Sequence, residues 1–326
     1  MYQTKALTGE YFKIFSGVYN DFRENSAKDY NFEVSPIEYQ DFINCFEKGY
    51  IKCIMLLEDG IPTGFCAYST QQEDVVELFI IHFLGDEDLK KKFRMLLTAF
   101  MQDISKERQT KIVEYPMLGR QKDFRIEVSS MGYNFVDLGV VKFDVLNKDK
   151  TRELLRVRPS NLPLGFKIIS YKENYLEELA SAIHLCFKNA SDTKFDPRFL
   201  TIDGCLDIAQ KITTSFYGKF IEDASKILLH ENKLVGFCLS NITEGKIGNI
   251  PLVGIIPEFQ KNGMSSTLLK STLDEIIRKN QNGLLNLSEV NASVDLANIR
   301  ACRMYRAVGF EEDYTYPQAY LEKISV

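Results

Sequence analysis

The sequence predicts a mixed α/β protein made of two similar halves, on three observations. The chain has 326 residues, more than one hydrophobic core usually supports. Segments with a helical apolar period alternate with short apolar runs bounded by turn residues. A Gly-Phe-Cys strand start recurs at Gly64 and Gly236, and a Gly-aromatic pair recurs at Gly132 and Gly309. These glycines are 68 residues apart in the first half and 73 in the second, which indicates one fold used twice.

The second half can be followed element by element. Strands are expected at 166–170, in a hairpin over 226–242, along 246–256 and in a run ending near residue 294. Helices are expected at 174–188, 204–216, 265–279 and 296–308, with a last β segment after residue 310. The third helix shows the pattern well, because its apolar residues fall on one face: Leu268, Leu269, Leu273, Ile276 and Ile277.

A linker is expected over 147–164. This stretch is charged at first and then carries Pro159 and Pro163 on either side of Ser160 and Asn161, a composition that breaks regular structure. The expected domains are therefore 1–146 and 165–326.

Composition and charge argue against several classes of protein. The hydrophobic content of 45% and charged content of 26% are those of an ordinary globular chain. A formal net charge of −5 argues against a nucleic-acid partner. The seven cysteines form no CxxC pair and there are three histidines, so no metal site is expected and the thiols suit a cytoplasmic protein. No apolar run approaches eighteen residues, so no membrane contact is expected.

One turn has the properties of an anion site. A buried strand ends at Pro257, a polar turn containing Lys261 and Gly263 follows, and a helix starts at once. Free N–H groups and the positive end of the helix dipole would meet there, and a diphosphate fits such a place. Gly263 would let the backbone approach the phosphates closely. The alternative is a plain strand-to-helix turn with Ser265 as the N-cap.

The helix further along adds a second motif. Ala301, Met304, Tyr305 and Val308 fall on one face, and Gly309 is placed to end the helix. Tyr305 is therefore on the buried side, yet its hydroxyl needs a partner. It is either a core tyrosine with its hydroxyl at the rim or a functional group.

These residues resemble the GCN5-related N-acetyltransferase (GNAT) superfamily over roughly residues 165–320. The family's phosphate loop reads Gln/Arg-x-x-Gly-x-Gly/Ala, matched by Gln260, Gly263 and Ser265, with Pro-Glu-Phe directly before it. Ser265 departs from the family's small apolar residue. The family's second motif is Asn-x-x-Ala-x-x-x-Tyr-x-x-x-Gly-Phe, which is matched throughout by Asn298, Ala301, Tyr305, Gly309 and Phe310.

The resemblance implies a fold and a set of roles. The fold would be two tandem domains, each a central mixed, mostly antiparallel twisted sheet flanked by helices. Strand residues Val253, Gly254 and Ile255 would pair with the pantetheine arm of acetyl-CoA. Asn298 would help to fix the cofactor and Tyr305 would protonate the departing thiolate. The pyrophosphate would be held by the N–H groups of Lys261, Asn262, Gly263, Met264, Ser265 and Ser266.

The first half is expected to be a silent copy of this fold. Where the phosphate loop should follow its strand at 75–83, the sequence carries three carboxylates, Asp86, Glu87 and Asp88, which repel a polyanion. Counting back from Gly132, the position of Tyr305 is taken by Val128 and that of Asn298 by Gln121.

The sequence therefore predicts an N-acetyltransferase that moves an acetyl group from acetyl-CoA to a primary amine of a small molecule or peptide. The attack would be direct, in a ternary complex. One alternative is a non-catalytic acyl-CoA-binding protein, against which the intact Tyr305 argues. Another is an aminoacyl-tRNA-dependent transferase, against which the net charge argues. No residue identifies the acceptor or the oligomeric state. The general base is also left open among Glu244, Glu289 and His230, none of which is assigned.

Overall fold

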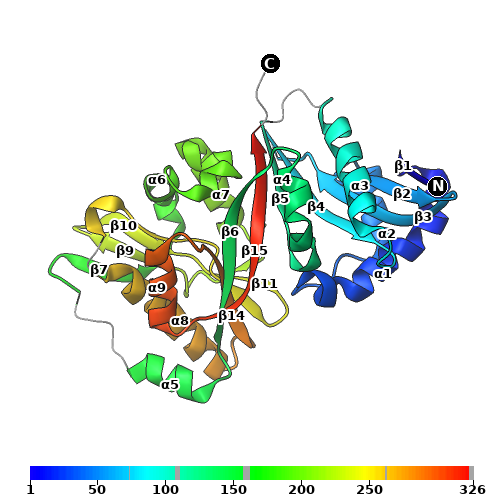
Figure 1. Ribbon diagram of the computed structural model, residues 1–326. Helices are drawn as coiled ribbons and strands as arrows, with labels where there is room; N and C mark the ends of the chain where they lie inside the picture. Colours follow the sequence, from blue (N-terminus) through cyan, green and yellow to red (C-terminus); the bar gives the residue numbers. More distant parts are fainter. Residues whose placement is uncertain (73, 107–110, 157–161, 261–262, 323–326) are drawn as a thin grey trace. The chain divides into compact units, whose positions relative to one another are not determined.

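The computed structural model describes residues 1–72, 74–106, 111–156, 162–260 and 263–322 (Figure 1). The chain divides into two compact units. Unit 1 consists of Met1–Asp137 with Tyr316–Val326, and unit 2 is Leu138–Thr315. Each unit thus contains the end of a strand that belongs to the other half of the sequence, which the repeat did not predict.

Unit 1 alternates strands and helices in the order expected of a mixed fold. Its strands are β1 (Tyr2–Ala6), β2 (Lys52–Glu58), β3 (Ile61–Ser69), β4 (Val75–Phe83), β5 (Ile112–Pro116) and the start of β6 (Asn134–Asp144). Its helices are α1 (Phe12–Tyr30), α2 (Tyr39–Glu47), α3 (Leu89–Ile104) and α4 (Arg125–Ser129), with 3-10 turns η1 (Gly9–Tyr11) and η2 (Gly119–Phe124).

The sheet of unit 1 runs β1-β2-β3-β4-β5, followed by the end of β15 (Glu311–Glu322). The pairs are antiparallel except for β4 with β5, which is parallel. Alternate residues of β2 enter different cores: Met55 packs with α1 and α2, and Leu56 packs with α3. This period of two places a helical layer on each face of the sheet.

Unit 2 begins with the end of β6 and repeats the pattern. Its helices are α5 (Lys148–Arg156), α6 (Leu176–Phe187), α7 (Ile202–Thr213), α8 (Met264–Gln281) and α9 (Ile299–Val308). Its 3-10 turns are η3 (Glu173–Tyr175), η4 (Ser191–Lys194), η5 (Pro197–Leu200) and η6 (Pro257–Phe259). Its strands are β7 (Phe166–Ser170), β8 (Lys219–Phe220), β9 (Lys226–His230), β10 (Lys233–Cys238), β11 (Asn241–Glu244), β12 (Ile247–Asn249), β13 (Val253–Ile255), β14 (Glu289–Asp295) and the start of β15.

The strands of unit 2 fall into two hydrogen-bonded groups, β6-β14-β12-β11-β8 and β13-β10-β9-β7. Leu228 of β9 enters the core formed by α8 and α9, and its neighbour Leu229 enters the core formed by α6 and α7. Both faces are therefore covered, and the mixed, mostly antiparallel sheet flanked by helices is confirmed in each unit. The helices expected near 265–279 and 296–308 are confirmed as α8 and α9.

At Gly64 and Gly236, the two glycines of the repeat, the next strand comes so close that it leaves no room for a side chain. A Cβ on Gly64 would lie 2.7 Å from the carbonyl oxygen of His82, and a Cβ on Gly236 would lie 2.4 Å from Cδ1 of Ile255. Each glycine faces the next strand of its own unit at equivalent register, opposite Phe83 and Ile255 respectively. The repeat in the sequence is therefore a repeat in the structure.

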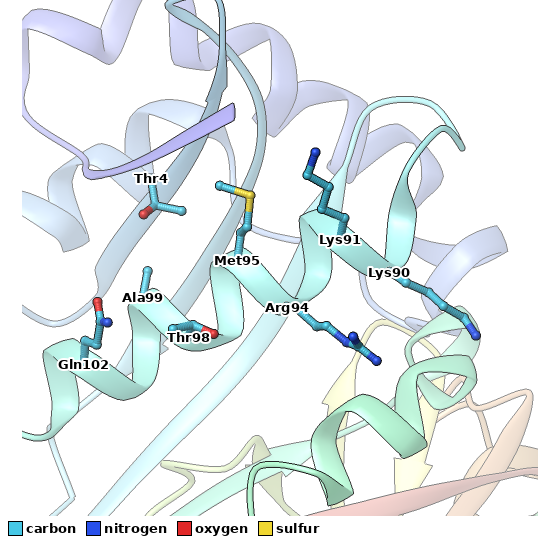
Figure 2. Close-up of a pocket in the computed structure, with 8 residues that line it drawn as sticks. All are labelled: Thr4, Lys90, Lys91, Arg94, Met95, Thr98, Ala99 and Gln102. Carbon is cyan, nitrogen blue, oxygen red and sulfur yellow. The ribbon is translucent and has the colours of Figure 1, made fainter. Parts of the chain in front are cut away.

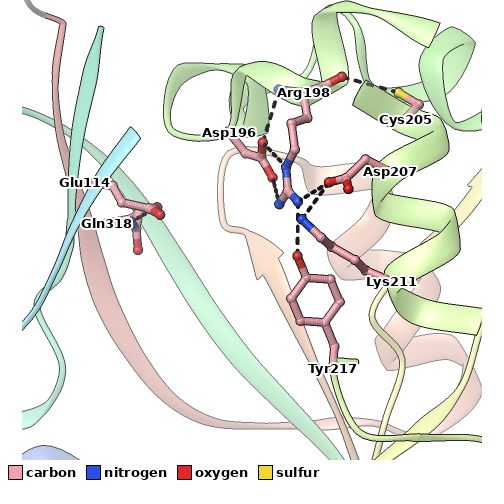
Figure 3. Close-up of polar contacts among 8 residues, drawn as sticks. All are labelled: Glu114, Asp196, Arg198, Cys205, Asp207, Lys211, Tyr217 and Gln318. Atoms are coloured by element: carbon pink, nitrogen blue, oxygen red, sulfur yellow. Dashed lines mark hydrogen bonds and ion pairs between the residues drawn. The ribbon is translucent and has the colours of Figure 1, made fainter. Parts of the chain in front are cut away.

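The last strand of the chain completes the sheet of unit 1. Gln318 through Glu322 pair with β5, and the Gln318 side chain donates a 3.0 Å hydrogen bond to Glu114 (Figure 3). In unit 2, β6 pairs with β14 from Leu138 to Asp144. The linker expected over 147–164 begins with a helix, α5, and its residues 157–161 lie outside the described residues. No helix among the described residues is long and apolar enough to cross a membrane.

Candidate active site

The strand expected along 246–256 is broken in the middle, and the break opens the sheet. β12 pairs in parallel with β14 only at residues 247–249, and the last bond between these segments is from Ile250 N to Asn291 O, at 2.8 Å. Pro251 follows and has no N–H to continue the ladder. β13 then pairs with β10 instead. β13 and β14 therefore diverge from Pro251 onward.

The divergence leaves one edge of β13 without a neighbouring strand among the described residues. Leu239 N bonds to Leu252 O, and Ile256 N bonds to Val235 O. Because hydrogen bonding alternates along an antiparallel pair, Gly254 also faces β10, whereas Val253 and Ile255 turn their N–H groups to the open side. These two peptide groups are placed to bind an extended chain.

A cavity of about 790 Å³ occupies the opening. Nine of the residues expected to hold acetyl-CoA or to act on it line this cavity: Val253, Gly254, Ile255, Gly263, Met264, Ser265, Ser266, Asn298 and Tyr305. The other two, Lys261 and Asn262, lie outside the described residues. Segments separated by some fifty residues in the sequence thus meet around one space.

The helix α8 starts at the wall of this cavity. Its N-cap is Gly263, at φ +69° and ψ 4°, and no side-chain hydrogen bond caps the helix. Ser265 is therefore in the first turn and is not the N-cap, which corrects the plain-turn alternative. The N–H groups of Met264, Ser265 and Ser266 precede the first helical bond, from Thr267 N to Gly263 O. Gln260 Nε2 donates to Ile255 O at 2.9 Å and so fixes the end of β13 beside the turn.

Asn298 and Tyr305 come from the next helix, α9. Asn298 is the N-cap, and its Oδ1 accepts the N–H of Ala301 at 3.1 Å. Its side-chain NH₂ has no hydrogen bond within the described part of the chain. Tyr305 is 4% exposed, with its ring edge against Phe310. Its hydroxyl likewise has no partner among the described residues, although the residue lines the cavity.

Burial raises the pKa of the Tyr305 phenol well above its ordinary value, and Cys238, Asp192 and Cys302 add to this effect. The phenol therefore keeps its proton at neutral pH. A buried donor without an acceptor is costly unless a ligand or water completes it. Tyr305 is thus a core residue that lines the cavity, and its role in the chemistry stays a prediction.

Sequence reasoning missed the acidic groups of the cavity. Asp192 comes from η4 and Asp295 from the end of β14, and both line the cavity. Burial raises the pKa of Asp192 to about 6, with Asp295 and Asp196 adding to it. Arg300 and Arg303 of α9 line the same cavity. No spacing in the sequence relates Asp192 to Tyr305, which is 113 residues later.

Of the three residues left open as general base, Glu289 and His230 do not line this cavity. Glu289 pairs with Ile247 at the closed end of β14. The ring of His230 packs on Phe166 and Phe259, with centroids 4.3 and 5.0 Å apart. The side chain of Glu244 is outside what the structure describes.

In unit 1 the equivalent opening is closed by a side chain. β4 pairs with β5 only from Val75 to Glu77 and then diverges. Gln121, 1% exposed, fills the gap: its Oε1 accepts the N–H of Ile81 at 3.0 Å and the hydroxyl of Tyr115 at 2.5 Å. Gln121 is the residue that the repeat aligns with Asn298. The edge of β4 is thus satisfied within the unit.

The turn before α3 in unit 1 also differs from the turn before α8. It carries Asp86, whose carboxylate binds Arg120 at 2.9 Å. A separate hollow lies along the outer face of α3 (Figure 2), lined by Thr4, Lys90, Lys91, Arg94, Met95, Thr98, Ala99 and Gln102. No residue of β4 or β5 lines it, so it is distinct from the opened strands. Over the described residues, no group of three or more acidic, Cys or His side chains could hold a metal ion.

Comparisons with known proteins agree with these features. Residues 202–310 match the acetyltransferase (GNAT) family model. That segment contains the turn before α8, the opened strands and α9. No curated protein matches the chain.

Solved structures resemble the chain over nearly its whole length. A GCN5-related N-acetyltransferase from Sphaerobacter thermophilus has a TM-score of 0.64 at 14% identity, over 98% of this chain and 95% of that one. A tandem GNAT protein from the clavulanic acid biosynthesis pathway has a TM-score of 0.62 at 10% identity, over 99% and 98%. A GCN5-related glucosamine N-acetyltransferase region of a fungal β-N-acetylglucosaminidase has a TM-score of 0.65 at 11% identity, over 98% of this chain and 38% of that one. At such identities the likeness concerns the fold.

Proposed function

The chain has the tandem GNAT fold and carries a GNAT-family acetyltransferase domain at residues 202–310, and on that premise we propose that it transfers an acetyl group from acetyl-CoA to a primary amine. The acceptor is a small molecule or a peptide, and the amine attacks directly in a ternary complex. Unit 2 performs the reaction, and unit 1 is a copy that has lost its cofactor site.

One observation carries this proposal: the open edge of β13 and the unpaired hydroxyl of Tyr305 line the same cavity. The N–H groups of Val253 and Ile255 would bind the amide groups of the pantetheine arm, as an added strand would. The same arm would lead the thioester toward Tyr305. The strand edge would bind the cofactor, and the phenol of Tyr305 would supply the proton that the departing thiolate needs.

The phosphates would lie at the start of α8. The uncapped N–H groups of Met264, Ser265 and Ser266 supply donors, and the helix dipole supplies partial positive charge. Arg300 and Arg303 add full charges to the wall of the cavity. The corresponding turn of unit 1 carries Asp86, Glu87 and Asp88 and would repel the same ligand.

Three groups of the chain would take part in the chemistry. The N–H of Ile255 would stabilise the oxyanion that forms when the amine attacks the thioester carbonyl. Tyr305 would donate its proton to the departing thiolate, a role for which its raised pKa keeps it protonated. Much of the rate would come from holding amine and thioester together. The side-chain NH₂ of Asn298, which does not take part in capping α9, would help to hold the pantetheine arm.

The presence of Tyr305 in the cavity favours an enzyme over a protein that only binds acyl-CoA, because a binder needs no proton donor at the sulfur. The net charge of −5 likewise favours a small acceptor over charged tRNA.

The test is calorimetric titration of acetyl-CoA into the intact chain and into Gly263→Glu and Gly85→Glu variants. The two positions are well matched, since Gly263 has φ +69° and Gly85 has φ +67°, and a Cβ on either meets no atom within 4 Å. Backbone strain is therefore similar, and only Gly263→Glu places a carboxylate at the proposed phosphate site.

We expect one site per chain with micromolar affinity, lost in Gly263→Glu and kept in Gly85→Glu. Equal loss in both variants would assign the effect to strain. No binding to the folded wild-type chain would refute the proposed function.

A further inference from the structure

Unit 2 contains an acidic corner that the proposed reaction has not yet used. Asp192 and Asp295 line the cavity together with Tyr305, and they approach from different elements, η4 and β14. After burial, which is the largest cause, the charges of Asp295 and Asp196 also raise the pKa of Asp192. Asp192 also influences Tyr305, so these groups are near neighbours.

The two carboxylates of the cavity, Asp192 and Asp295, differ in the hydrogen bonds that they accept. Asp295 Oδ2 accepts the hydroxyl of Ser191 at 2.6 Å, and its Oδ1 accepts the N–H of Ala297 at 2.8 Å. Asp192 has no ion pair and no side-chain donor within the described part of the chain. Asp192 is therefore the carboxylate that is open to a ligand.

A network of polar contacts holds the segment that carries Asp192 (Figure 3). Arg198 of η5 donates to Asp196 through Nε at 2.9 Å and Nη2 at 2.7 Å, and through Nη1 to Asp207 at 3.0 Å. Asp196 N in turn bonds to Asp192 O at 2.8 Å. Arg198 thereby neutralises Asp196 and fixes the backbone around Asp192, whereas Asp192 itself forms no ion pair with the residues that the structure describes.

A second observation at this corner points to a ligand. Tyr305 is only 4% exposed and lines the same cavity, and its hydroxyl has no hydrogen-bond partner in the described part of the chain. A buried donor and an unneutralised carboxylate at one cavity suit a ligand that brings both an acceptor atom and a positive charge. A thioester beside an ammonium group has this composition.

We propose that Asp192 receives the acceptor amine as its ammonium ion and removes the proton that must leave before attack. This proposal rests on the proposed function and deepens it: the acceptor is a cationic primary amine, and Asp192 is its general base. Asp295 accepts the hydroxyl of Ser191, the neighbour of Asp192 in the chain, and so helps to position Asp192, while its carboxylate adds negative charge to the corner.

The protons and bonds balance as follows. Asp192 takes one proton from the ammonium ion, and the freed lone pair of nitrogen forms the C–N bond at the thioester carbonyl. The C–S bond breaks, its electron pair goes to sulfur, and Tyr305 donates its proton to the thiolate. The second nitrogen proton returns to the Tyr305 oxygen, directly or through water, and Asp192 later releases its proton to solvent.

The pKa of about 6 suits this role, because Asp192 is ionised at neutral pH yet basic enough to hold the proton briefly. The charges that act on Asp192 are those of Asp295 and Asp196, and other titratable groups share its cavity. Those that line the same cavity are Cys186 of α6, Asp295 of β14, and Arg300, Arg303 and Tyr305 of α9.

The test compares the wild-type chain with Asp192→Asn, and with Asp203→Asn as a control on the exposed face of α7. Release of the coenzyme A thiol is measured at saturating acetyl-CoA, with n-butylamine and 1,4-diaminobutane as acceptors, from pH 5.5 to 9. If Asp192 removes the proton from the bound ammonium ion, kcat/KM of the wild type rises around pH 6 and is then level. Asp192→Asn must use the scarce free amine, so its kcat/KM is roughly hundredfold lower at pH 7 and rises tenfold per pH unit.

Acetyl-CoA binding, measured in the same variants, separates this proposal from the function on which it rests. We expect the affinity to be unchanged in Asp192→Asn. A level profile in Asp192→Asn would overturn the role of Asp192 alone. Acetyl-CoA binding without turnover of either amine by the wild-type chain would overturn both the role of Asp192 and the proposed transfer. Failure of the wild type to bind acetyl-CoA would overturn the proposed function as well.

Discussion

β4 of unit 1 and β13 of unit 2 occupy equivalent places, and their free edges have opposite fates. By register, Ile81 lies opposite Cys66 as Val253 lies opposite Cys238. The N–H of Ile81 bonds to Gln121, whereas the N–H of Val253 faces a cavity. One fold thus gives either a closed strand edge or an edge that lines a cavity, depending on whether a side chain of the same unit reaches the edge of the strand.

The neighbouring position shows the same contrast. His82, opposite Phe65, is buried, and its Nδ1 lies 2.8 Å from the hydroxyl of Tyr30. Its equivalent is Gly254, where a Cβ would lie 2.8 Å from Phe237 and 2.9 Å from the sulfur of Cys186. At this position unit 1 buries a large side chain, whereas unit 2 packs Phe237 and Cys186 so closely that only glycine fits.

The largest expected effect tests the catalytic side of the contrast. Tyr305→Phe removes the hydroxyl that unit 1 lacks at Val128, and kcat should fall on the order of 10²- to 10³-fold. The affinity for acetyl-CoA should change little. Steady-state rates of thiol release measure the effect, with Tyr133→Phe of unit 1 as a control that keeps full activity. Similar rates for Tyr305→Phe and wild type would mean that Tyr305 is a core residue.

The next effect concerns the stability of unit 1. Although Asp21 Oδ2 lies 3.1 Å from Nε2 of His82, burial, with the charge of Arg120, lowers the pKa of His82 to about 4. The unfolded chain protonates near 6.5, so stability is complete above pH 6.5 and decreases as the pH falls from 6.5 to 4. The loss should approach about 3 kcal/mol.

Glu77 and Asp192 have raised pKa values, to about 7 and about 6, and shift stability in the opposite direction over this range. The effect of His82 is therefore measured as a difference between wild type and His82→Phe in denaturant unfolding at pH 7 and pH 4.5. The stability gap between the two should shrink as the pH falls. A gap that does not change with pH would contradict the assignment.

A smaller effect tests the closure of unit 1. Gln121→Leu leaves the N–H of Ile81 and the hydroxyl of Tyr115 without their acceptor, which should cost about 2 kcal/mol of unfolding free energy. Binding of acetyl-CoA should be unaffected, since it is assigned to unit 2. Chemical denaturation measures the loss, with Gln210→Leu on the exposed face of α7 as the control. A second acetyl-CoA site appearing in Gln121→Leu would show that unit 1 is only blocked and still competent.

The smallest effect concerns the departure from the family's phosphate loop. The side chain of Ser265 does not cap α8, and its contribution to phosphate binding is expected to come from its backbone N–H. Ser265→Ala keeps that group, so the dissociation constant for acetyl-CoA should change by less than about threefold. Calorimetry gives the value directly, and a tenfold loss would assign the hydroxyl to the phosphates.

Local patterns could be predicted because the forces that produce them act between neighbours in the chain. The strand at 166–170, the helices α8 and α9, and the left-handed glycines that border them follow from apolar period and backbone conformation alone. The structure gathers nine expected site residues around one cavity, although their roles stay predictions. The assignment of the ends of β6 and β15 to the two units could not be foreseen, because the residue pattern of a strand does not show which strand it will pair with.

The sequence by itself determined that the fold is used twice and that one half carries both the turn from Gln260 to Ser265 and the motif with Tyr305, because each motif consists of residues a few positions apart. Only the tertiary structure decided that the strand opens at Pro251, that Gln121 closes the same opening in unit 1, and that Asp192 joins Tyr305. These arrangements depend on which distant segments pack together. Burial and charge at the site arise from that packing, and no spacing along the chain encodes them.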